Sequence, residues 1–359
     1  MEASDIAYLN QLGLLKNFIY LFSICIVIEQ FAKKKPINSF FIGIIFSLIF
    51  TLFVSTPQIN LNNWWNDHVV YAIGFLSGEV ISSASAASEP LFYAMTSFIR
   101  LLTDNYIIYF FIIAAIYTGA YLWASKRMTN NNGTLIMFMM FVTSLFFVAY
   151  GVNTIRAGLA MSLLILGFTF YNQSKITFAI LALCAINIHL SMLLTLSAFI
   201  AALFIKKPKM CFTIWLVSII LSISLGSWFE GIFASTFEDD RTQIYLMQDP
   251  TKALYNVGFR WDFVIYSLIP IVMGYYYIYR HHFQDKFYTI LYCTYLIANS
   301  FWVLVIRANF TDRFAYLSWA LMPIILMYPL LTGNIFRHQN NKIALMLLFN
   351  VAITFVLSL

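Results

Sequence analysis

The sequence predicts an all-α, polytopic integral membrane protein with about ten full transmembrane helices and one re-entrant helical hairpin. Hydrophobic residues make up 61% of the chain and charged residues only 10%, whereas about a quarter of a soluble domain is charged. Apolar runs long enough to span a bilayer recur from end to end. Short basic loops alternate with longer acidic ones. We therefore expect a single transmembrane domain over residues 1–359.

The net charge of +6 does not indicate a nucleic-acid partner, because most lysines lie in short loops that set membrane topology. The four cysteines lie in or beside apolar runs, without the spacing of a disulfide framework or a metal site. The sequence therefore predicts no nucleic-acid partner, no metal and no other cofactor.

The first apolar run, residues 12–31, precedes the strongest basic cluster, Lys33 to Lys35. By the positive-inside rule this cluster is cytoplasmic, which places the N-terminus outside. No basic region with a small-residue cleavage site precedes the run, so we expect it to be retained as a span. Residues 37–54 then return to the outer side.

Residues 55–104 form the first long outer loop. Within it, Pro90 precedes the apolar segment 91–100, which is too short to span and is predicted to be an interfacial helix. Pro90 suits the first turn of a helix, and a carboxylate at Glu89 would favour the helix dipole. Asp67 and Glu89 are candidate general bases, because carboxylates near pyrophosphate can take a raised pKa. A solvated loop acid is the simpler interpretation of each.

Residues 176–205 are long enough for one span, but one span would place the basic cluster of residues 206–209 outside, against the charge rule. Two half-helices meeting near His189 would return that cluster to the cytoplasm, so we predict a re-entrant hairpin. Broken helices occur at membrane depth only where they are buried or line a wet cavity. His189 is a further candidate base, although a lone buried histidine is more often structural.

The other expected spans are residues 106–124, 134–150, 153–171, 212–229, 263–279, 287–306, 314–331 and 343–359. Residues 230–262 form a second long outer loop, and both termini are expected outside.

Arg156 stands near the start of an apolar run. A charge near the bilayer centre costs about 2.5–3.5 kcal/mol on insertion scales, and arginine cannot avoid this cost by losing its proton. An anionic ligand would offset the cost, whereas snorkelling to the headgroups is the simpler explanation. No acidic residue is near Arg156 in the sequence, which favours the ligand.

The arginines on the predicted outer side are Arg156, Arg241, Arg260, Arg307 and Arg313. They oppose the charge rule, so each needs a physical reason. A guanidinium fork matches phosphate oxygens bidentately, so arginines converging on one cavity would suit a lipid-linked phosphate. Local pairing is the alternative. Asp262 adjoins Arg260, Asp312 adjoins Arg313, and acidic residues 239 and 240 adjoin Arg241.

Five short motifs follow one another between about residues 60 and 330: Asp67-x3-Tyr71, Glu89-Pro90, Asn153-x2-Arg156-Ala157, His189-x-Ser191 and Arg313-Phe314-x-Tyr316. Each is weak alone, but their order resembles the EpsG-like branch of Wzy-type polysaccharide polymerases. Ala157 departs from the pattern, because many relatives have glutamine there.

The resemblance implies a GT-C-like glycosyltransferase of the bacterial inner membrane, with its active site facing the periplasm. It would polymerise undecaprenyl-pyrophosphate-linked oligosaccharide repeat units of O-antigen or capsule, without a metal. Its partners would be the lipid-linked glycan donor and acceptor, membrane lipids, and a chain-length regulator and flippase. Candidate substrate-binding residues are Asn153, Arg156, Tyr71, Arg260, Arg307, Arg313 and Tyr316. Candidate catalytic residues are Asp67, Glu89 and His189.

Among the candidate bases we favour Asp67, because a carboxylate is the usual acid–base group beside a glycosidic centre. Two other functions stay open. A flippase for lipid-linked oligosaccharides would use similar cations but predicts internal repeats, and none is visible. A membrane acyltransferase that modifies surface glycans predicts a histidine-rich core, whereas His189 is the one histidine in a predicted membrane segment.

Overall fold

The computed structural model describes residues 3–57, 59, 67–78, 88–236, 258–308 and 311–358, and every regular element in these ranges is helical. By length and composition, seven of these helices can cross a membrane, or eight if one bent pair counts as a span. The protein is therefore a multi-pass, all-helical membrane protein, as the sequence predicts. Some expected spans are shorter apolar helices, so the count of about ten and the GT-C-like arrangement stay predictions.

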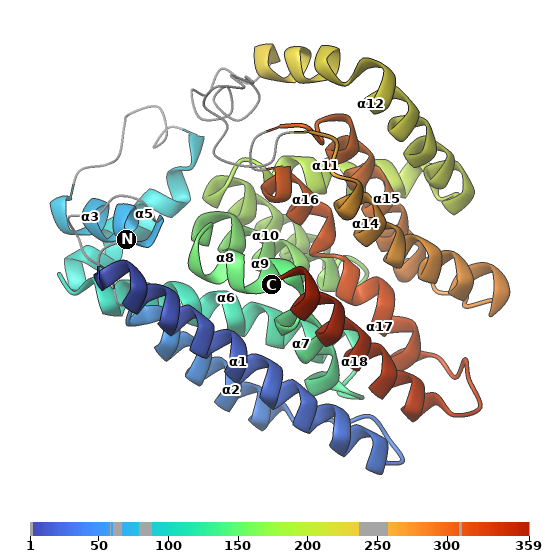
Figure 1. Cartoon of the computed structure of the whole chain (residues 1–359), viewed down its shortest axis with the longest axis horizontal. Helices are drawn as coiled ribbons and strands as arrows, with labels where there is room; N and C mark the ends of the chain where they lie inside the picture. Colours follow the sequence, from blue (N-terminus) through green and yellow to red (C-terminus); the bar gives the residue numbers. More distant parts are fainter. Residues whose placement is uncertain are drawn as a thin grey trace. The chain divides into compact units, whose positions relative to one another are not determined.

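The residues cluster into two compact units, Met1–Leu193 with Leu330–Leu359, and Leu194–Pro329. The first unit contains α1 (Ala3–Ala32), α2 (Phe40–Ser55), α3 (Asp67–Ser77), α5 (Pro90–Leu102), α6 (Tyr106–Met128), α7 (Thr134–Val142), α8 (Leu145–Val152), α9 (Ile155–Phe170), α10 (Lys175–Ile188) and α18 (Gln339–Leu357) (Figure 1). The second contains α12 (Pro208–Thr236), α14 (Trp261–Tyr275), η1 (Tyr276–Arg280), α15 (Lys286–Leu304) and α16 (Thr311–Trp319). Helices α11 (Met192–Ile205) and α17 (Met322–Thr332) each continue from one unit into the other. The single domain over residues 1–359 stays a prediction.

Short polar side chains begin several of the helices. Ser39, Asn105, Ser174 and Asp285 each accept a hydrogen bond from a backbone N–H in the first turn of α2, α6, α10 and α15. The first N–H groups of a helix have no partner within it, so these caps fix where each helix starts.

The basic loops of the first unit pack against one another at one end of the unit. The Asn340 side-chain amide donates to the Lys34 carbonyl, and the Asn132 amide donates to the Leu331 carbonyl at 3.2 Å. These bonds join the loop after α1 to the start of α18 and the loop after α6 to the end of α17, on either side of the third basic loop. This grouping agrees with the predicted placement of all three loops on the same side of the membrane.

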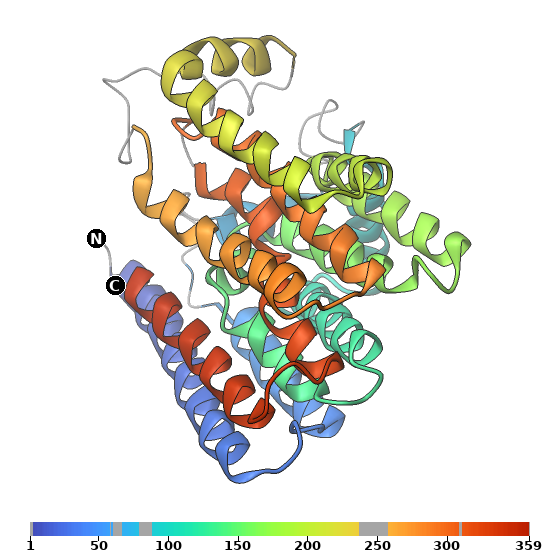
Figure 2. The same cartoon turned by 90° about the vertical axis from the view of Figure 1, so that its right-hand side faces the viewer.

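The end of α18 packs against the middle of α1 (Figure 2), where the Tyr20 hydroxyl lies 3.0 Å from the Ser358 hydroxyl. The opposite end of the first unit holds the start of α1. There the Gln11 amide of α1 donates to the Thr56 carbonyl at 2.7 Å. The Tyr8 hydroxyl lies 3.2 Å from Nδ1 of His68 in α3. The acidic first loop therefore begins at the end away from the basic loops.

The expected span over residues 134–150 is divided into α7 and α8, which are bent by 71°. At the break, the Thr143 and Ser144 hydroxyls each donate to the carbonyl four residues earlier, a bond that bends helices. The Asn350 amide from α18 donates to the Met140 carbonyl at 3.1 Å and to the Thr143 hydroxyl at 2.8 Å. The broken backbone is thus stabilised by protein groups, as membrane depth requires.

The predicted outer loops contain helices beyond those expected. The helix expected at residues 91–100 is present as α5, and α3 precedes it; the interfacial position of α5 stays a prediction. In the second loop, α12 continues to Thr236, and residues 237–257, including Arg241, lie outside the described residues.

The predicted hairpin segment consists of two helices, α10 and α11, with residues 189–191 between them. The backbone at His189 is extended, with φ −153° and ψ 117°. The expected break is therefore present, while the re-entrant path of residues 176–205 stays a prediction.

Candidate functional site

Glu89 lies at the centre of an ionic cluster in the first unit. One carboxylate oxygen accepts a short hydrogen bond from Nη1 of Arg156, and the other forms a short hydrogen bond with Nδ1 of His189. Glu89 immediately precedes α5, Arg156 is the second residue of α9, and His189 follows α10. The fold thus brings together side chains that are 67 and 100 positions from Glu89 in the sequence.

Arg156 is held by aromatic hydroxyls as well as by Glu89. Its Nε donates to the Tyr71 hydroxyl of α3 at 3.0 Å, and its Nη1 lies 3.4 Å from the Tyr93 hydroxyl of α5. Its Nη2 has no hydrogen-bond partner within the described ranges, and 12% of the side chain is exposed. The guanidinium is therefore fixed on one side and keeps donors on the other.

The carboxylate of Glu89 is ionised despite its burial. Burial alone would raise the pKa of Glu89, but the hydrogen bond and charge of His189, the charge of Arg156 and the Leu190 backbone lower it overall. A cation in the first turn of a helix is unfavourable, because the helix dipole is positive there. Glu89 therefore offsets the cost of placing Arg156 at the start of α9.

His189 is positioned so that one ring nitrogen stays accessible. An ionised carboxylate only accepts hydrogen bonds, so the His189 Nδ1 facing Glu89 carries its hydrogen. In the neutral ring, Nε2 is then a proton acceptor. This nitrogen has no hydrogen-bond partner in the described part of the chain, and 29% of the side chain is exposed. A base oriented by a carboxylate is a recurrent arrangement in catalytic sites.

Gly158 allows the turn that places Arg156. A Cβ atom at Gly158 would lie 2.4 Å from the Tyr150 carbonyl oxygen, so α9 packs against α8 more closely than a side chain permits. Asn153, in the connection between these helices, is exposed, and its side chain forms no hydrogen bond with a described residue. Its predicted role in substrate binding stays a prediction.

Helix α3 carries Asp67, His68 and Tyr71. Asp67 lies in its first turn, one turn before Tyr71. Burial raises the pKa of Tyr71, and the negative charge of Asp67 adds to this effect. The Tyr71 hydroxyl is therefore protonated at neutral pH and can accept the bond from Arg156. The predicted role of Asp67 as a base stays a prediction.

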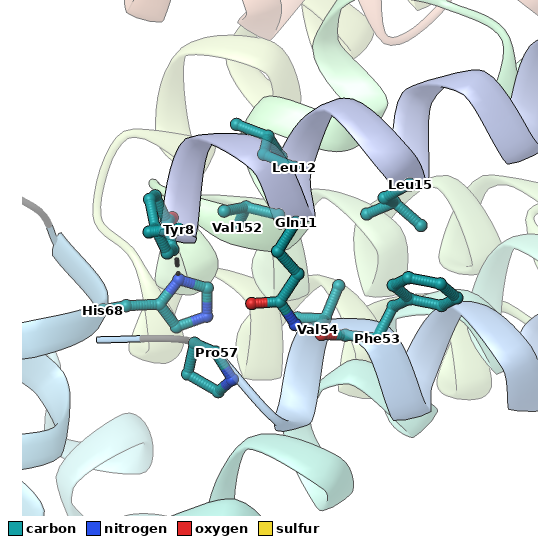
Figure 3. Close-up of a pocket in the computed structure, with 9 residues that line it drawn as sticks. All are labelled: Tyr8, Gln11, Leu12, Leu15, Phe53, Val54, Pro57, His68 and Val152. Carbon is teal, nitrogen blue, oxygen red and sulfur yellow. Dashed lines mark hydrogen bonds between the residues drawn. The ribbon is translucent and has the colours of Figure 1, made fainter. Parts of the chain in front are cut away.

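His68 anchors α3 on α1. It lines a pocket with Tyr8 and Gln11 of α1, Val54 of α2 and Val152 of α8, and its ring faces Tyr8 (Figure 3). His68 is only 1% exposed, and burial lowers the pKa of this imidazole to about 4. It is therefore neutral at physiological pH and acts as a structural group.

The other predicted substrate-binding residues belong to the second unit. Arg260 forms two hydrogen bonds with Asp262, at 3.0 and 2.6 Å, which is the local pairing weighed as an alternative. Arg313 is the third residue of α16, and Tyr316 in the same helix is 7% exposed. Convergence of these residues on a substrate stays a prediction.

Arg307 has a structural contact in the second unit. Its Nη1 donates to the Ser222 carbonyl at 2.6 Å, next to the irregular backbone of Leu225 in α12. A Cβ atom at Gly226 would lie 2.0 Å from the same nitrogen. Arg307 therefore supplies a donor where the helix is kinked, a role that the sequence did not suggest.

Tyr93 was missed by the sequence analysis. It lies one turn after Glu89 at the start of α5, so both side chains project from the same face of the helix toward Arg156. That four-residue spacing from Glu89 was the available signal. Within the described ranges, no group of three or more His, Cys, Asp or Glu side chains could hold a metal ion.

Comparison with known proteins gives one match. A model of the EpsG family matches residues 43–359. Neither the curated proteins nor the solved structures give a match. The family match spans most of the chain and includes every member of the Glu89 cluster. On this basis the chain belongs to the EpsG family.

Proposed function

We propose that this protein is a membrane glycosyltransferase that polymerises undecaprenyl-pyrophosphate-linked oligosaccharide repeat units at the periplasmic face of the bacterial inner membrane. Membership of the EpsG family supports a glycan-polymerising activity in a membrane. The observation that carries the proposal is the Glu89 bridge between Arg156 and His189. It places a phosphate-binding cation and a proton acceptor on two sides of one buried carboxylate.

In this proposal His189 activates the acceptor. Nε2 of His189 takes the proton from a sugar hydroxyl of the acceptor repeat unit, and the hydroxyl oxygen forms a bond with the anomeric carbon of the donor glycan. The imidazolium that forms is stabilised by the neighbouring carboxylate of Glu89, which stays ionised. Glu89 is thus a positioning residue, and His189 is the catalytic residue.

Arg156 acts on the leaving group. As the new bond forms, the bond between the anomeric carbon and the pyrophosphate oxygen breaks, and undecaprenyl pyrophosphate leaves with the electron pair. Donors already aimed at a developing charge are an effective source of transition-state stabilisation. The Nη2 of Arg156, which has no partner among the described residues, supplies such donors, and Tyr71 and Tyr93 hold the guanidinium in place.

Asp67 is the alternative base, and a histidine held by a carboxylate favours His189 over it. The test uses the purified full-length protein with lipid-linked repeat units in excess chelator. We expect His189→Gln and Glu89→Gln to retain lipid binding and to lose turnover by about 100- to 10,000-fold. Asp67→Asn should retain most activity. His338→Gln is the matched control, because His338 precedes α18 at the basic end of the first unit.

Three results would revise the proposal. An active His189→Gln variant with an inactive Asp67→Asn variant would move the base to Asp67. Activity that chelator stops and magnesium restores would show that a metal is required. Vectorial movement of lipid-linked units without chain extension would favour the flippase.

The periplasmic location is tested separately. Glu89, Tyr71 and Tyr93 belong to the first acidic loop, which begins away from the basic loops of the first unit. In a cysteine-free background, Asp104→Cys should react with an impermeant reagent added from outside, and Lys34→Cys should not. The reverse pattern would place the site on the cytoplasmic face.

A further inference from the structure

The position of Arg156 depends on α3, because Tyr71 in this helix binds Nε of Arg156. At the N-terminal end of α3, the His68 contact with Tyr8 fixes the helix against α1. The C-terminal end needs its own restraint, because the last carbonyls of any helix have no partner within it.

Arg100 provides that restraint. It lies in the last turn of α5, and its Nη1 donates to the Phe75 carbonyl near the end of α3 at 3.0 Å. A cation at the C-terminal end of a helix is favoured by the helix dipole. The residue after α3 is Gly78, at φ +65°. A Cβ atom there would lie 2.0 Å from Nη1 of Arg100 and 2.5 Å from its Cζ.

The contact point is packed as well as hydrogen-bonded. Phe75 is 1% exposed, and its ring stacks on Tyr109 of α6 with 4.6 Å between centroids. Tyr71 lies one turn before Phe75, so the two side chains lie on the same face of α3. Holding the Phe75 backbone therefore holds the helical turn from which Tyr71 reaches Arg156.

We propose that Arg100 is a positioning residue that clamps the end of α3 and so keeps Tyr71 against Arg156. This inference rests on the proposed function, in which Arg156 stabilises the pyrophosphate leaving group. An alternative role for Arg100 is contact with lipid headgroups. The bond to a helix-terminal carbonyl and the close approach to Gly78 favour the clamp.

The test compares Arg100→Ala, Arg100→Lys and Gly78→Ala in the full-length protein. Displacing a catalytic group by a small distance can cost about 100-fold in rate, so we expect kcat of Arg100→Ala to fall about 10- to 100-fold. KM for the lipid-linked donor should change less than about twofold, because the contact acts in the transition state. Lysine keeps a donor and the charge, so Arg100→Lys should recover part of the loss.

Gly78→Ala approaches the same contact from the other side. It leaves Arg100 in the chain but displaces its guanidinium, so it should reproduce the fall in kcat. The kcat of the Arg100→Ala/Gly78→Ala double variant should be no lower than that of the slower single variant, because both changes break the same contact. Gly119→Ala is the matched control, since no atom of the described residues lies within 4 Å of a Cβ at Gly119.

Hydrogen exchange of the α3 amides separates the clamp from the chemistry. We expect faster exchange in Arg100→Ala and Gly78→Ala than in the wild type and Gly119→Ala. Unchanged exchange, or faster exchange with unchanged kcat, would overturn the inference. So would full rescue by lysine with an unaffected Gly78→Ala variant, which would indicate headgroup binding. If the wild type polymerises nothing, the proposed function fails, and the exchange rates still decide whether Arg100 restrains α3.

Discussion

The Glu89 cluster of the first unit contrasts with a second polar cluster, around Asn299 in α15 of the second unit. The Asn299 carbonyl accepts from the Trp215 indole at 2.8 Å. Its amide donates to the Ser267 hydroxyl at 3.2 Å and to the Ser318 hydroxyl at 2.9 Å. These side chains are neutral and buried.

The difference between the clusters lies in charge and in unused hydrogen-bonding atoms. The Glu89 cluster contains an ionised carboxylate and a guanidinium, and Arg156 and His189 each keep a polar atom without a described partner. The amide of Asn299 has partners on both its oxygen and its nitrogen. A satisfied neutral network joins helices in a membrane, whereas charges kept partly accessible indicate a functional site.

Among the changes that test this comparison, breaking the charged cluster at Arg156 should have the largest effect. We expect Arg156→Ala to reduce turnover by about 100- to 1,000-fold, the usual cost of losing one donor to a developing charge. Arg156→Lys should rescue poorly, because an ammonium lacks the bidentate fork. Glycan ladders and protein levels measure both variants. Full activity of the alanine variant would remove the basis for assigning this cluster to catalysis.

The buried His68 should make the stability of the first unit depend on pH. Its folded-state pKa of about 4 is below the ordinary 6.5, so the unfolded chain binds the proton more readily. The free energy of unfolding is unaffected by His68 above about pH 6.5. It falls by roughly 3 kcal/mol as the pH drops to about 4, because the unfolded chain takes up the proton first.

In thermal unfolding measured between about pH 6.5 and pH 4, His68→Gln should reduce the loss of stability with falling pH. Glu89 contributes only at the acidic end of this range, because its pKa is lowered from an ordinary value of 4.5 and its effect therefore begins below about that pH. An unchanged slope in the variant would show that other groups titrate there.

Breaking the neutral network should affect stability and leave the chemistry intact. Asn299→Ala leaves the buried Trp215 indole without its acceptor, which costs about 1–3 kcal/mol. Activity per folded molecule should stay at the wild-type level. Asn187→Ala is the matched control, because Asn187 is on α10 and, among the described residues, its side chain bonds a carbonyl of its own helix. Loss of activity in a fully folded Asn299→Ala protein would assign this network a catalytic role.

The smallest expected effect concerns the backbone beneath Arg156. Gly158→Ala places a Cβ against the Tyr150 carbonyl, so we expect about 1–2 kcal/mol of destabilisation from overpacking. Turnover should fall as well, since α9 carries Arg156. A Cβ at Gly119 meets no described atom within 4 Å, so Gly119→Ala should not destabilise the protein. Equal unfolding temperatures of Gly158→Ala and Gly119→Ala would show that α8 and α9 can move apart to accommodate a Cβ.

The sequence by itself determined the helical, multi-pass architecture. In a bilayer every backbone polar group needs an internal partner, so apolar runs of this length become helices. Local chemistry also predicted a helix beginning at Pro90 and a break near His189, because proline at a first turn and the charge of the following loop are sequence-local signals. The Arg260 pairing with Asp262 was likewise within reach, since the two residues are neighbours.

The tertiary structure alone decided how the candidate residues combine. The sequence contained Glu89, Arg156 and His189 but gave no acid near Arg156, because the partner is 67 positions away. The bend between α7 and α8 depends on Asn350, which is more than 200 positions further along the chain. The donor from Arg307 to α12 is equally non-local. Such contacts depend on which helices pack together. The residue pattern of one segment does not indicate which distant segments will pack against it.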